Sequence, residues 1–367
     1  MKNILIVDDS ALMRRVLSDI INSDEELHND QYATNGIDAL ELLDTGKKFD
    51  VIILDINMPK MNGIEFLRKL NRKRRTEKVI IVSTIAREGA KETIEALELG
   101  AFDFVTKPGS LLEARGSEFG RKLISLIRSA CNMTIPAEIR GSKVKTAENK
   151  VQTPFSTIGR SDRSKHSVKA LGAGSSKLVA LACSTGGPKA LQYVIPFLPA
   201  NLDAPILLVQ HMPEGFTASL SKRLNELSRI NVKEAEDGDV LQKGTVYIAK
   251  GGSQMRLHEN GKKNFTISET VEAARNGLKP CADIMYESLM NTSFDEITCV
   301  IMTGMGADGT QGILQLEKTN KIYVIGQDAE SSTVYGMPKA IAEAGAVDEV
   351  VTLKGIADAI IKHVGVR

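Results

Sequence analysis

The chain of 367 residues contains no tryptophan, and only 4% of its residues are aromatic. It therefore lacks the stacking platforms on which proteins usually bind single-stranded nucleic acids. Its formal net charge of +1 gives no overall field that would attract nucleic acid or an anionic membrane. No apolar run approaches the roughly 20 residues that span a bilayer. We therefore expect no nucleic-acid partner and no direct insertion into a membrane.

Cysteine is also sparse. The four cysteines, Cys131, Cys183, Cys281 and Cys299, lie far apart in the sequence and form no C-x-x-C pair. This spacing excludes an obvious zinc or redox motif and is typical of reduced thiols in the cytoplasm. The first residues, MKNILIVDDS, reach two acids too soon for a signal peptide. The sequence thus predicts a cytoplasmic protein, and a monomer is the expected oligomeric state.

The residues that are present divide the chain into three parts. With 42% hydrophobic and 25% charged residues, the composition is that of a globular protein, and the length predicts about two or three domains. Residues 1–130 and 177–367 alternate strand-like with helix-like patterns, whereas residues 131–176 are rich in Lys, Ser, Thr and Gly. Residues 141–177 include eight basic residues and two acidic ones. We expect a flexible basic linker there, with a specific basic docking site as the alternative.

The pattern of residues 1–130 predicts a doubly wound open sheet of parallel strands. Short β-branched or aromatic runs, which suit strands buried on both faces, occur at Ile4–Val7, Val51–Leu54, Val79–Val82 and Phe102–Val105, with a weaker strand near Tyr32. The amphipathic segments between them are Ala11–Ile21, Ile37–Leu43, Gly63–Leu70 and Gly89–Leu99, and a last helix is expected at about Phe119–Cys131.

Residues 177–367 predict a second α/β domain. The expected parallel strands are Leu178–Cys183, Ile206–Gln210, Ile297–Thr303 and Ile322–Ile325. Helical patterns follow Pro188, Phe216, Thr310 and Pro338. We further expect antiparallel strands at Val246–Ala249 and in a hairpin that turns at Asn260–Gly261. This domain should therefore contain a doubly wound, mainly parallel sheet with an antiparallel hairpin.

An acidic cluster is expected at the carboxyl ends of the strands in the first domain. Asp8 and Asp9 end the first strand, and Asp55 ends the third. Ligands of such sheets collect at this edge, and three carboxylates repel one another there unless a cation lies among them. Mg²⁺ fits because it uses few protein carboxylates and keeps waters for a phosphoryl oxygen. Ser83 and Lys107 follow neighbouring strands and are expected to contact a phosphoryl group. The alternative is surface acids that bind nothing.

Three reactive side chains follow strands of the second domain. Ser184 lies in CSTGGP, His211 in LLVQHMP and Asp308 in MTGMGADG. A serine becomes a nucleophile when an imidazole takes its proton and a carboxylate orients the imidazole. Because the carboxyl ends of parallel strands lie at one edge of a sheet, we expect these side chains to meet there as a serine hydrolase site. Their order in the chain matches none of the best-known serine hydrolases, so the prediction depends on geometry.

Each of these residues also has a simpler interpretation. A lone serine before a helix is often a cap, a strand-end histidine is often structural, and an aspartate in a Gly-rich loop is often a turn residue. Gly304–Gly309 also matches G-x-G-x-x-G, and Asp328 follows at about the spacing of a dinucleotide-binding fold. Asp308 inside that turn would repel a pyrophosphate, which disfavours nicotinamide binding. Cys183 alternates to the opposite face from Ser184, and we expect it to be buried core.

Residues 1–125 resemble the receiver domain of two-component response regulators in the motifs LIVDDS, VIILDINMPKMNG, VSTIA and FVTKP. The resemblance implies a flavodoxin-like fold and phosphorylation of Asp55 by a partner histidine kinase. It implies that Mg²⁺ is held by Asp8, Asp9, Asp55 and the carbonyl of Asn57. It also places Ser83 as the switch hydroxyl and Phe104 as an aromatic that rotates on phosphorylation.

The second domain resembles the catalytic domain of chemotaxis protein-glutamate methylesterases/glutaminases in the segments ACSTGGP, LLVQHMPEGFTASLSKRL, VKEAEDGD, VIMTGMGADGTQG and VYGMPKAI. By this resemblance, Ser184 is the nucleophile, His211 the base and Asp308 the orienting acid. The implied substrates are γ-glutamyl methyl esters and certain glutamines on methyl-accepting chemoreceptors, and a chemotaxis histidine kinase is the implied phosphodonor. Two departures are small: Ala182-Cys183 replaces the usual Gly-Ala, and Ala307 replaces a residue that is often polar.

A mechanism follows as a hypothesis. His211 deprotonates Ser184, and the backbone amides of Thr185 and Met305 stabilise the oxyanion. The esterase reaction needs no cofactor, and activity should fall on the acid side of roughly pH 6–7 because the imidazole must be neutral. The receiver is expected to cover the hydrolase cleft and to leave on phosphorylation. The alternative is a phospho-dependent scaffold with an inactive second domain; a transcriptional regulator is disfavoured because no helix-turn-helix follows the receiver.

Overall fold

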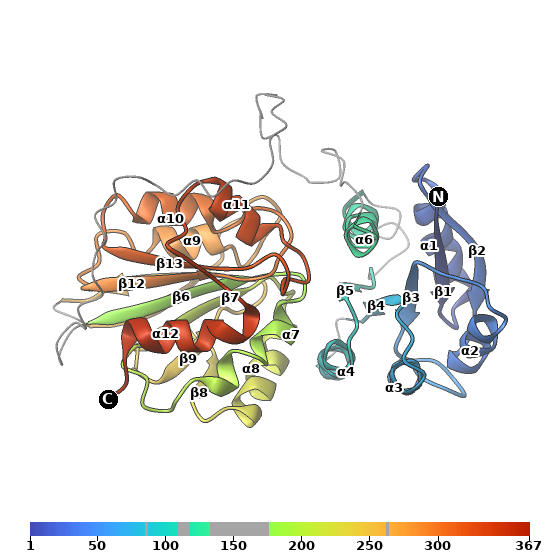
Figure 1. Cartoon of the computed structure of the whole chain (residues 1–367), viewed down its shortest axis with the longest axis horizontal. Helices are drawn as coiled ribbons and strands as arrows, with labels where there is room; N and C mark the ends of the chain where they lie inside the picture. Colours follow the sequence, from blue (N-terminus) through green and yellow to red (C-terminus); the bar gives the residue numbers. More distant parts are fainter. Residues whose placement is uncertain (85–86, 109–116, 133–175, 262–263) are drawn as a thin grey trace.

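The computed structural model describes residues 1–84, 87–108, 117–132, 176–261 and 264–367. They form two α/β units that lie side by side (Figure 1). Apart from residues 131, 132 and 176, the expected linker lies outside the described residues. Within these ranges, no helix combines the length and the apolar character that crossing a bilayer requires.

The first unit is built on a five-stranded sheet in the order β2-β1-β3-β4-β5, and every pairing is parallel. The strands are β1 (Lys2–Val7), β2 (Leu27–Ala33), β3 (Val51–Asp55), β4 (Lys78–Ser83) and β5 (Asp103–Thr106). The helices are α1 (Ala11–Asn22), α2 (Gly36–Asp44), α3 (Gly63–Arg72), α4 (Arg87–Glu98) and α6 (Ser117–Ala130). The order is that of flavodoxin-like folds, so the predicted doubly wound sheet is confirmed.

Helices on both faces explain why the central strands of this sheet are buried along most of their length. All five residues of β3 are buried, because α1 and α6 pack together on one face while α2, α3 and α4 pack in series on the other. Short polar residues start the helices. The side chain of Ser10 accepts from the N–H of Met13 in α1, and Asn62 forms a capping box with Glu65 in α3. These caps stabilise the turns that follow the strand ends.

The second unit contains a seven-stranded parallel sheet in the order β14-β13-β12-β6-β7-β9-β8. Its strands are β6 (Lys177–Cys183), β7 (Ile206–Gln210), β8 (Asn231–Glu234), β9 (Thr245–Ile248), β12 (Glu296–Ile301), β13 (Ile322–Gln327) and β14 (Glu349–Val351). Its helices are α7 (Gly187–Leu191), η1 (Ile195–Phe197), α8 (Phe216–Leu227), α9 (Ala282–Glu287), α10 (Thr310–Leu316), α11 (Met337–Glu343), η2 (Leu353–Gly355) and α12 (Ile356–Val364).

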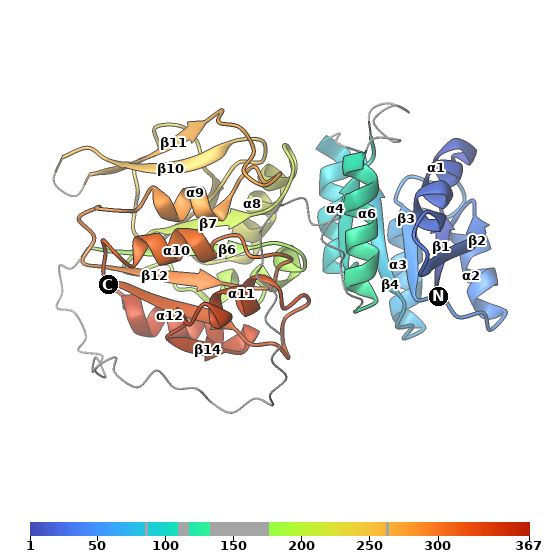
Figure 2. The ribbon, with the colours of Figure 1, turned by 90° about the horizontal axis from the view of Figure 1, so that it is seen from above.

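The prediction of an antiparallel strand at Val246–Ala249 is wrong. This segment forms β9, which pairs in parallel with both β7 and β8. Residues 235–244 return the chain along the length of the sheet, so β9 starts at the same edge as β8. The predicted hairpin is confirmed as β10 (Gln254–Glu259) and β11 (Phe265–Thr270), which pair antiparallel in a separate two-stranded sheet (Figure 2).

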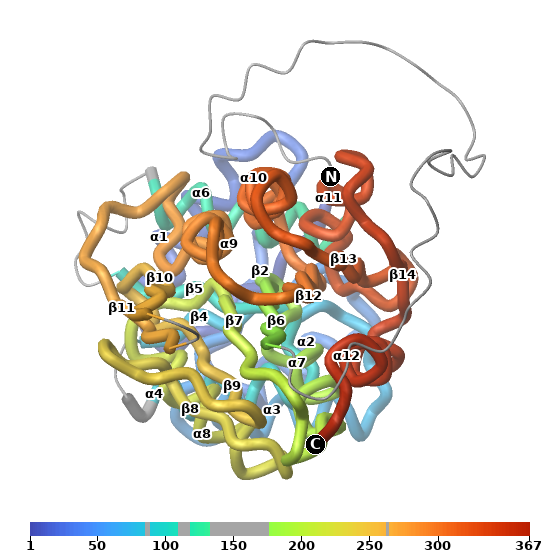
Figure 3. Tube along the Cα trace, turned by 90° about the vertical axis from the view of Figure 1, so that its left-hand side faces the viewer, coloured from blue at the N-terminus to red at the C-terminus, as the bar shows by residue number. Residues whose placement is uncertain are grey.

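The strands that carry the expected active-site residues lie next to one another. β12, β6 and β7 are consecutive in the sheet, and Figure 3, which faces the second unit, shows them near its centre. Their carboxyl ends point toward the first unit (Figure 2). The loops after these strands therefore lie beside α4, β5 and α6 of the first unit.

Candidate active site

Ser184 is half-buried directly after β6, a strand whose seven residues are all buried. Its N–H donates to the carbonyl of Thr303 at 3.0 Å, which ties it to the loop after β12. Gly186, with φ of +78°, turns the chain into α7. A Cβ on this residue would lie 2.4 Å from Thr333 Cβ. Glycine is therefore required for the sharp exit that leaves Ser184 at the edge of the sheet.

The loop after β12 also packs closely on the serine. A Cβ on Gly304 would lie 2.9 Å from Ser184 Cβ and 2.3 Å from Met337 Sδ. The glycine at the start of the G-x-G-x-x-G segment thus lets this loop approach the serine. That role accounts for the glycine without a dinucleotide.

His211 follows β7, and hydrogen bonds fix its backbone beside the turn that carries Ser184. Its N–H donates to the carbonyl of Cys183 at 3.2 Å. Gln210, which is buried, donates from Nε2 to the carbonyl of Ser184 at 3.1 Å and to that of His211 at 3.2 Å. Its Oε1 accepts from Cys183 Sγ at 3.1 Å. One amide thus links both turns. The sequence reasoning missed Gln210; the only signal is a polar residue that ends the otherwise apolar β7.

Asp308 is the partner of the histidine. His211 Nε2 lies 2.7 Å from Asp308 Oδ2, and both side chains are largely buried. Burial disfavours the charged carboxylate, but the hydrogen bond and charge of His211, with the amides of Asp283 and Ala282, outweigh it and hold the pKa of Asp308 well below its usual value. Because the carboxylate is ionised, Nε2 is the nitrogen that carries the proton. Nδ1 is then the nitrogen free to accept one.

Ser184 and His211 follow adjacent strands. In the described part of the chain, no hydrogen bond joins the Ser184 hydroxyl to the ring of His211. Such bonds are often long before substrate binds and tighten in the complex. Cys183 is fully buried, as expected, and burial raises the pKa of its thiol. A buried, protonated thiol on the opposite face of β6 is a poor nucleophile.

The two expected oxyanion donors flank Ser184. Thr185 follows it directly, and Met305 follows Gly304, whose backbone approaches Ser184. Among the described residues, none accepts a hydrogen bond from the backbone N–H of Thr185 or from that of Met305. Both amides therefore remain available to a ligand. Met305 also makes a side-chain contact, because its Sδ accepts from Ser125 Oγ of α6 at 2.9 Å.

The acidic cluster of the first unit lies at the ends of β1 and β3. The carboxylates of Asp8, Asp9 and Asp55 lie within 4.8 Å of one another. Lys107 Nζ lies 2.6 Å from Asp55 Oδ2 and 3.0 Å from Asp8 Oδ2. Burial raises the pKa of Asp55, although Lys107 opposes the rise. Burial would lower the pKa of Lys107, but Asp55 and Asp8 overcome this and raise it.

These residues fit a divalent cation. Asp8 Oδ2 is buried, and Lys107 Nζ is its ion-pair partner at 3.0 Å. Three carboxylates clustered this closely, with one lysine between two of them, suit a hard cation such as Mg²⁺. The N–H of Asn57 donates to Asp55 Oδ1 at 3.4 Å, which places the Asn57 backbone beside the cluster. Ser83 is buried at the end of β4, and its hydroxyl accepts from Thr93 at 2.7 Å.

Among the described residues, side-chain contacts connect the first unit to α8 and to the loops that follow β6 and β12. The ring of Phe104 in β5 stacks on that of Phe216 in α8, with centroids 4.7 Å apart. Asp103 in β5 lies beside Thr185, whose side chain opposes the rise that burial causes in the pKa of Asp103, and Ser125 Oγ donates to Met305 Sδ. Arg223 of α8 pairs with Glu98 of α4, with the shortest N–O distance at 2.6 Å. The first unit therefore contacts both residues expected to donate to the oxyanion.

Two family models match this chain, one in each unit. Residues 179–360 match the family model described as CheB methylesterase, and residues 4–115 match that of the response regulator receiver domain. A Pyrococcus abyssi protein named protein-glutamate methylesterase/protein-glutamine glutaminase is 41% identical over 364 residues, which cover 98% of this chain and 93% of that protein. A Halalkalibacterium halodurans protein of the same name is 40% identical and covers 98% of this chain and 97% of its own. The crystal structure of the Thermotoga maritima CheB methylesterase catalytic domain is 38% identical and matches with a TM-score of 0.49, covering 51% of this chain and 98% of its own.

Proposed function

Because the chain belongs to the protein-glutamate methylesterase/protein-glutamine glutaminase family, we propose that it is a serine hydrolase regulated by its receiver domain. It demethylates glutamate methyl esters, and deamidates certain glutamines, on methyl-accepting chemoreceptors. We assign residues 1–130 to the receiver, 131–176 to a basic linker and 177–367 to the catalytic domain. The observation that carries the proposal is the 2.7 Å pair of His211 and Asp308 beside the turn that presents Ser184.

The chemistry follows from the ionisation of this pair. Ser184 Oγ attacks the ester carbonyl carbon, and His211 takes the hydroxyl proton on Nδ1 because Nε2 is already bonded to Asp308. Asp308 fixes the tautomer and stabilises the imidazolium. The proton then passes to the leaving methoxide, methanol departs, and Ser184 is left acylated. Nδ1 next activates a water, which hydrolyses the acyl-enzyme to the free carboxylate. With glutamine, the leaving group is ammonia.

The developing oxyanion is held by the backbone N–H groups of Thr185 and Met305. Each such donor is typically worth about 3–4 kcal/mol of transition-state stabilisation. Support comes from the absence of any acceptor for either amide in the described part of the chain and from their position on both sides of Ser184. No metal or cofactor takes part in the esterase reaction.

The receiver controls access to this site. Its partner is a chemotaxis histidine kinase, which phosphorylates Asp55. Mg²⁺ would be held by Asp8, Asp9, Asp55 and the carbonyl of Asn57, and when bound it neutralises charge on the phosphoryl oxygens. Ser83 and Lys107 then contact the phosphoryl group, and Phe104 turns toward Ser83. That movement separates Phe104 from Phe216 and frees the loops around Ser184. We place these reactions in the cytoplasm.

One experiment tests the proposal. Methanol release from methylated receptors is measured with and without a small phosphodonor, for the natural chain, for Ser184→Ala and for a control, Ser268→Ala, on the distant β11. We expect Ser184→Ala to lose at least about 10³-fold in kcat and to escape labelling by a fluorophosphonate, while the control behaves like the natural chain. Full activity of Ser184→Ala would overturn the nucleophile, and an inactive natural chain would favour a scaffold.

A further inference from the structure

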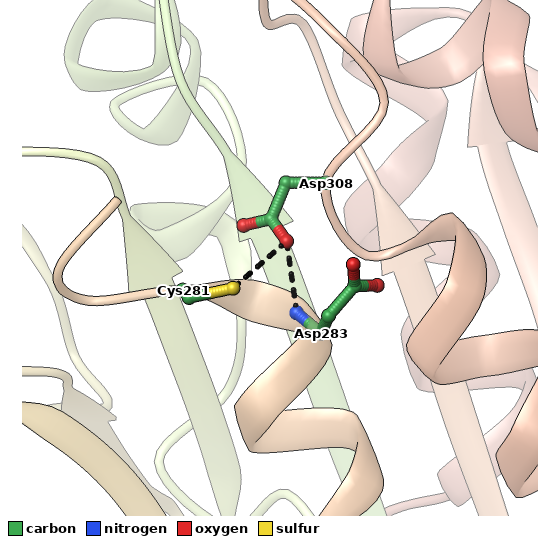
Figure 4. A group of neighbouring side chains, drawn as sticks. All are labelled: Cys281, Asp283 and Asp308. Atoms are coloured by element: carbon green, nitrogen blue, oxygen red, sulfur yellow. Dashed lines mark hydrogen bonds between the residues drawn. The ribbon is translucent and has the colours of Figure 1, made fainter. Parts of the chain in front are cut away.

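The segment that begins α9 holds the carboxylate of Asp308. Cys281 Sγ donates to Asp308 Oδ1 at 3.1 Å, and the N–H of Asp283 donates to the same oxygen at 3.0 Å. The N–H of Ala282 donates at 2.6 Å to Oδ2, the oxygen that also bonds His211. Figure 4 shows Cys281 and Asp283 converging on the carboxylate. Oδ1 thus depends on two donors, of which only the thiol is a side-chain group.

We propose that Cys281 is a positioning residue for the methylesterase reaction. Its thiol fixes the rotation of the Asp308 carboxylate, and the carboxylate in turn orients the ring of His211. This inference rests on the proposed function, since it concerns the acid of that same site. It assigns a catalytic consequence to a cysteine whose sequence context gives no sign of one.

The thiol is present as a donor at neutral pH. Cys281 is only 1% exposed, and burial, followed by the charge of Asp308, raises the pKa of its thiol far above its ordinary value. The thiol is therefore neither a nucleophile nor an easily oxidised group.

The same group of atoms does not form a metal centre. Ligand atoms of Cys281, Asp283 and Asp308 lie within 4.8 Å of one another. However, each oxygen of Asp308 already accepts two hydrogen bonds. Asp283 Oδ1 accepts from the N–H groups of Gly309 and Gly312. A cation would have to displace protons that already satisfy these oxygens.

A purely structural role for Cys281 predicts a different behaviour. Its neighbours Ala282, Met285 and Tyr286 belong to the hydrophobic core, so shortening Cys281 also loosens packing. Cys299 offers a matched control, because it is fully buried in β12 and, within the part of the chain that the structure describes, its thiol has no hydrogen bond to the site residues. Cysteine-to-alanine changes at both positions remove the same atom from the core. Only the change at Cys281 removes a donor to Asp308.

The experiment compares Cys281→Ala, Cys281→Ser and Cys299→Ala in the full chain activated by a phosphodonor. kcat and KM for methanol release are measured as a function of pH, and the Nε2 proton of His211 is followed by NMR in protein with ¹⁵N-labelled histidine. The hydroxyl of Cys281→Ser keeps a hydrogen-bond donor to Asp308, whereas the methyl group of Cys281→Ala removes it. Thermal melting of each variant confirms that it is folded.

We expect Cys281→Ala to lower kcat about 3- to 10-fold with KM changed less than twofold, since a thiol is a weak donor to a charged acceptor. Loss of the donor concentrates negative charge on the oxygens of Asp308. The acid limb of the kcat profile should therefore move to higher pH, and the Nε2 proton of His211 should shift downfield. Cys281→Ser should restore both values, and Cys299→Ala should change neither.

The proposal is overturned if Cys281→Ala and Cys281→Ser give the same kcat profile and the same ring-proton shift, whether both match the natural chain or both differ from it. The NMR signal of the His211 Nε2 proton can be measured in a protein that does not turn over substrate. If the natural chain releases no methanol, the proposed function fails, while the NMR comparison still decides whether Cys281 positions Asp308.

Discussion

Two neighbouring carboxylates in this site have opposite shifts in acidity. Asp308 is held ionised, chiefly by His211, whereas burial and the charge of Asp308 raise the pKa of Asp283 to about 6. Asp283 Oδ1 accepts from the N–H of Gly309 at 3.0 Å and from that of Gly312 at 2.7 Å. It therefore joins α9 to the start of α10, where the loop that carries Asp308 ends. When Asp283 is ionised, this junction destabilises the fold, because its buried negative charge lies beside that of Asp308.

We expect Asp283→Asn to stabilise the second unit at neutral pH. A raised pKa in the folded state means that folding favours the protonated acid, so this contribution to the free energy of unfolding is complete below about pH 4 and is lost as the pH rises through 6. An amide keeps an oxygen for both glycine N–H groups and carries no charge. The gain should be on the order of 2 kcal/mol at pH 7–8 and should vanish near pH 4, as measured by denaturant unfolding.

The control for this prediction is Asp358→Asn, which removes an exposed acid from α12. Its effect on stability should stay small at every pH. The prediction fails if the Asp283→Asn protein has a lower free energy of unfolding than the natural chain at pH 8. It also fails if the difference in free energy of unfolding does not depend on pH. Either result would show that the charged form of Asp283 is needed for the junction.

Helix α4 of the first unit and helix α8 of the second form part of the interface between the two units. They pack against each other, and the Glu98–Arg223 pair joins them with two hydrogen bonds of 2.6 and 3.2 Å. The arginine is 40% exposed and the glutamate 19%. Because water and salt reach the arginine, such a pair contributes only about 0.5–1 kcal/mol. It adjusts the docking of the receiver without dominating it.

Glu98→Gln should raise the methanol release of the unphosphorylated full chain about 2- to 5-fold, which corresponds to the loss of that interaction. The rise should shrink at high salt, where the natural pair is screened. Glu226→Gln is the control, because Glu226 also contacts Arg223, at 3.6 Å, but belongs to α8 itself. An unchanged rate for Glu98→Gln, or an equal rise for both variants, would mean that the ion pair does not hold the receiver in place.

Sequence patterns identified the elements that place the site but not the elements that complete it. The long apolar runs of β6, β7 and β12 are visible because both faces of the sheet are covered. β8 and β14 are short edge strands with mixed burial, and α9 is a six-residue helix with no visible period. The carboxyl-end rule predicts Ser184, His211 and Asp308 at one edge, and in the structure they follow β6, β7 and β12, which are consecutive in the sheet. The bonds from Cys281 and Gln210 depend on tertiary packing, which local pattern does not encode.

For the whole molecule, the position of the receiver predicts that the intact chain is slower than its catalytic part. The receiver contacts Thr185 through Asp103 and Met305 through Ser125, and these two residues flank Ser184, the proposed nucleophile. Deleting residues 1–140 should therefore raise basal methanol release severalfold, measured on the same methylated receptors. If the shortened protein is no faster than the unphosphorylated chain, occlusion is wrong, and phosphorylation acts by positive activation or by docking to receptors.

Removal of divalent cations should separate the two halves of the protein functionally. Three clustered acids with one lysine beside them need a further cation before a phosphoryl group can join them. A chelator should therefore abolish the stimulation of methanol release by a phosphodonor and leave the basal rate in place, and excess Mg²⁺ should restore the stimulation. Loss of the basal rate in the chelator would place a metal requirement in the hydrolase. Stimulation that persists would remove the cation from the phosphorylation step.

The stack of Phe104 on Phe216 also predicts an effect of chemoreceptor binding on the phosphorylation of Asp55. If the inward turn of Phe104 accompanies phosphorylation, the ring cannot adopt that turn and keep its partner in α8 at the same time. Free-energy coupling between two such events is reciprocal. A chemoreceptor that pulls the hydrolase away from the receiver would then lower the work of phosphorylating Asp55. A bound chemoreceptor would thus favour phosphorylation of the enzyme that modifies it.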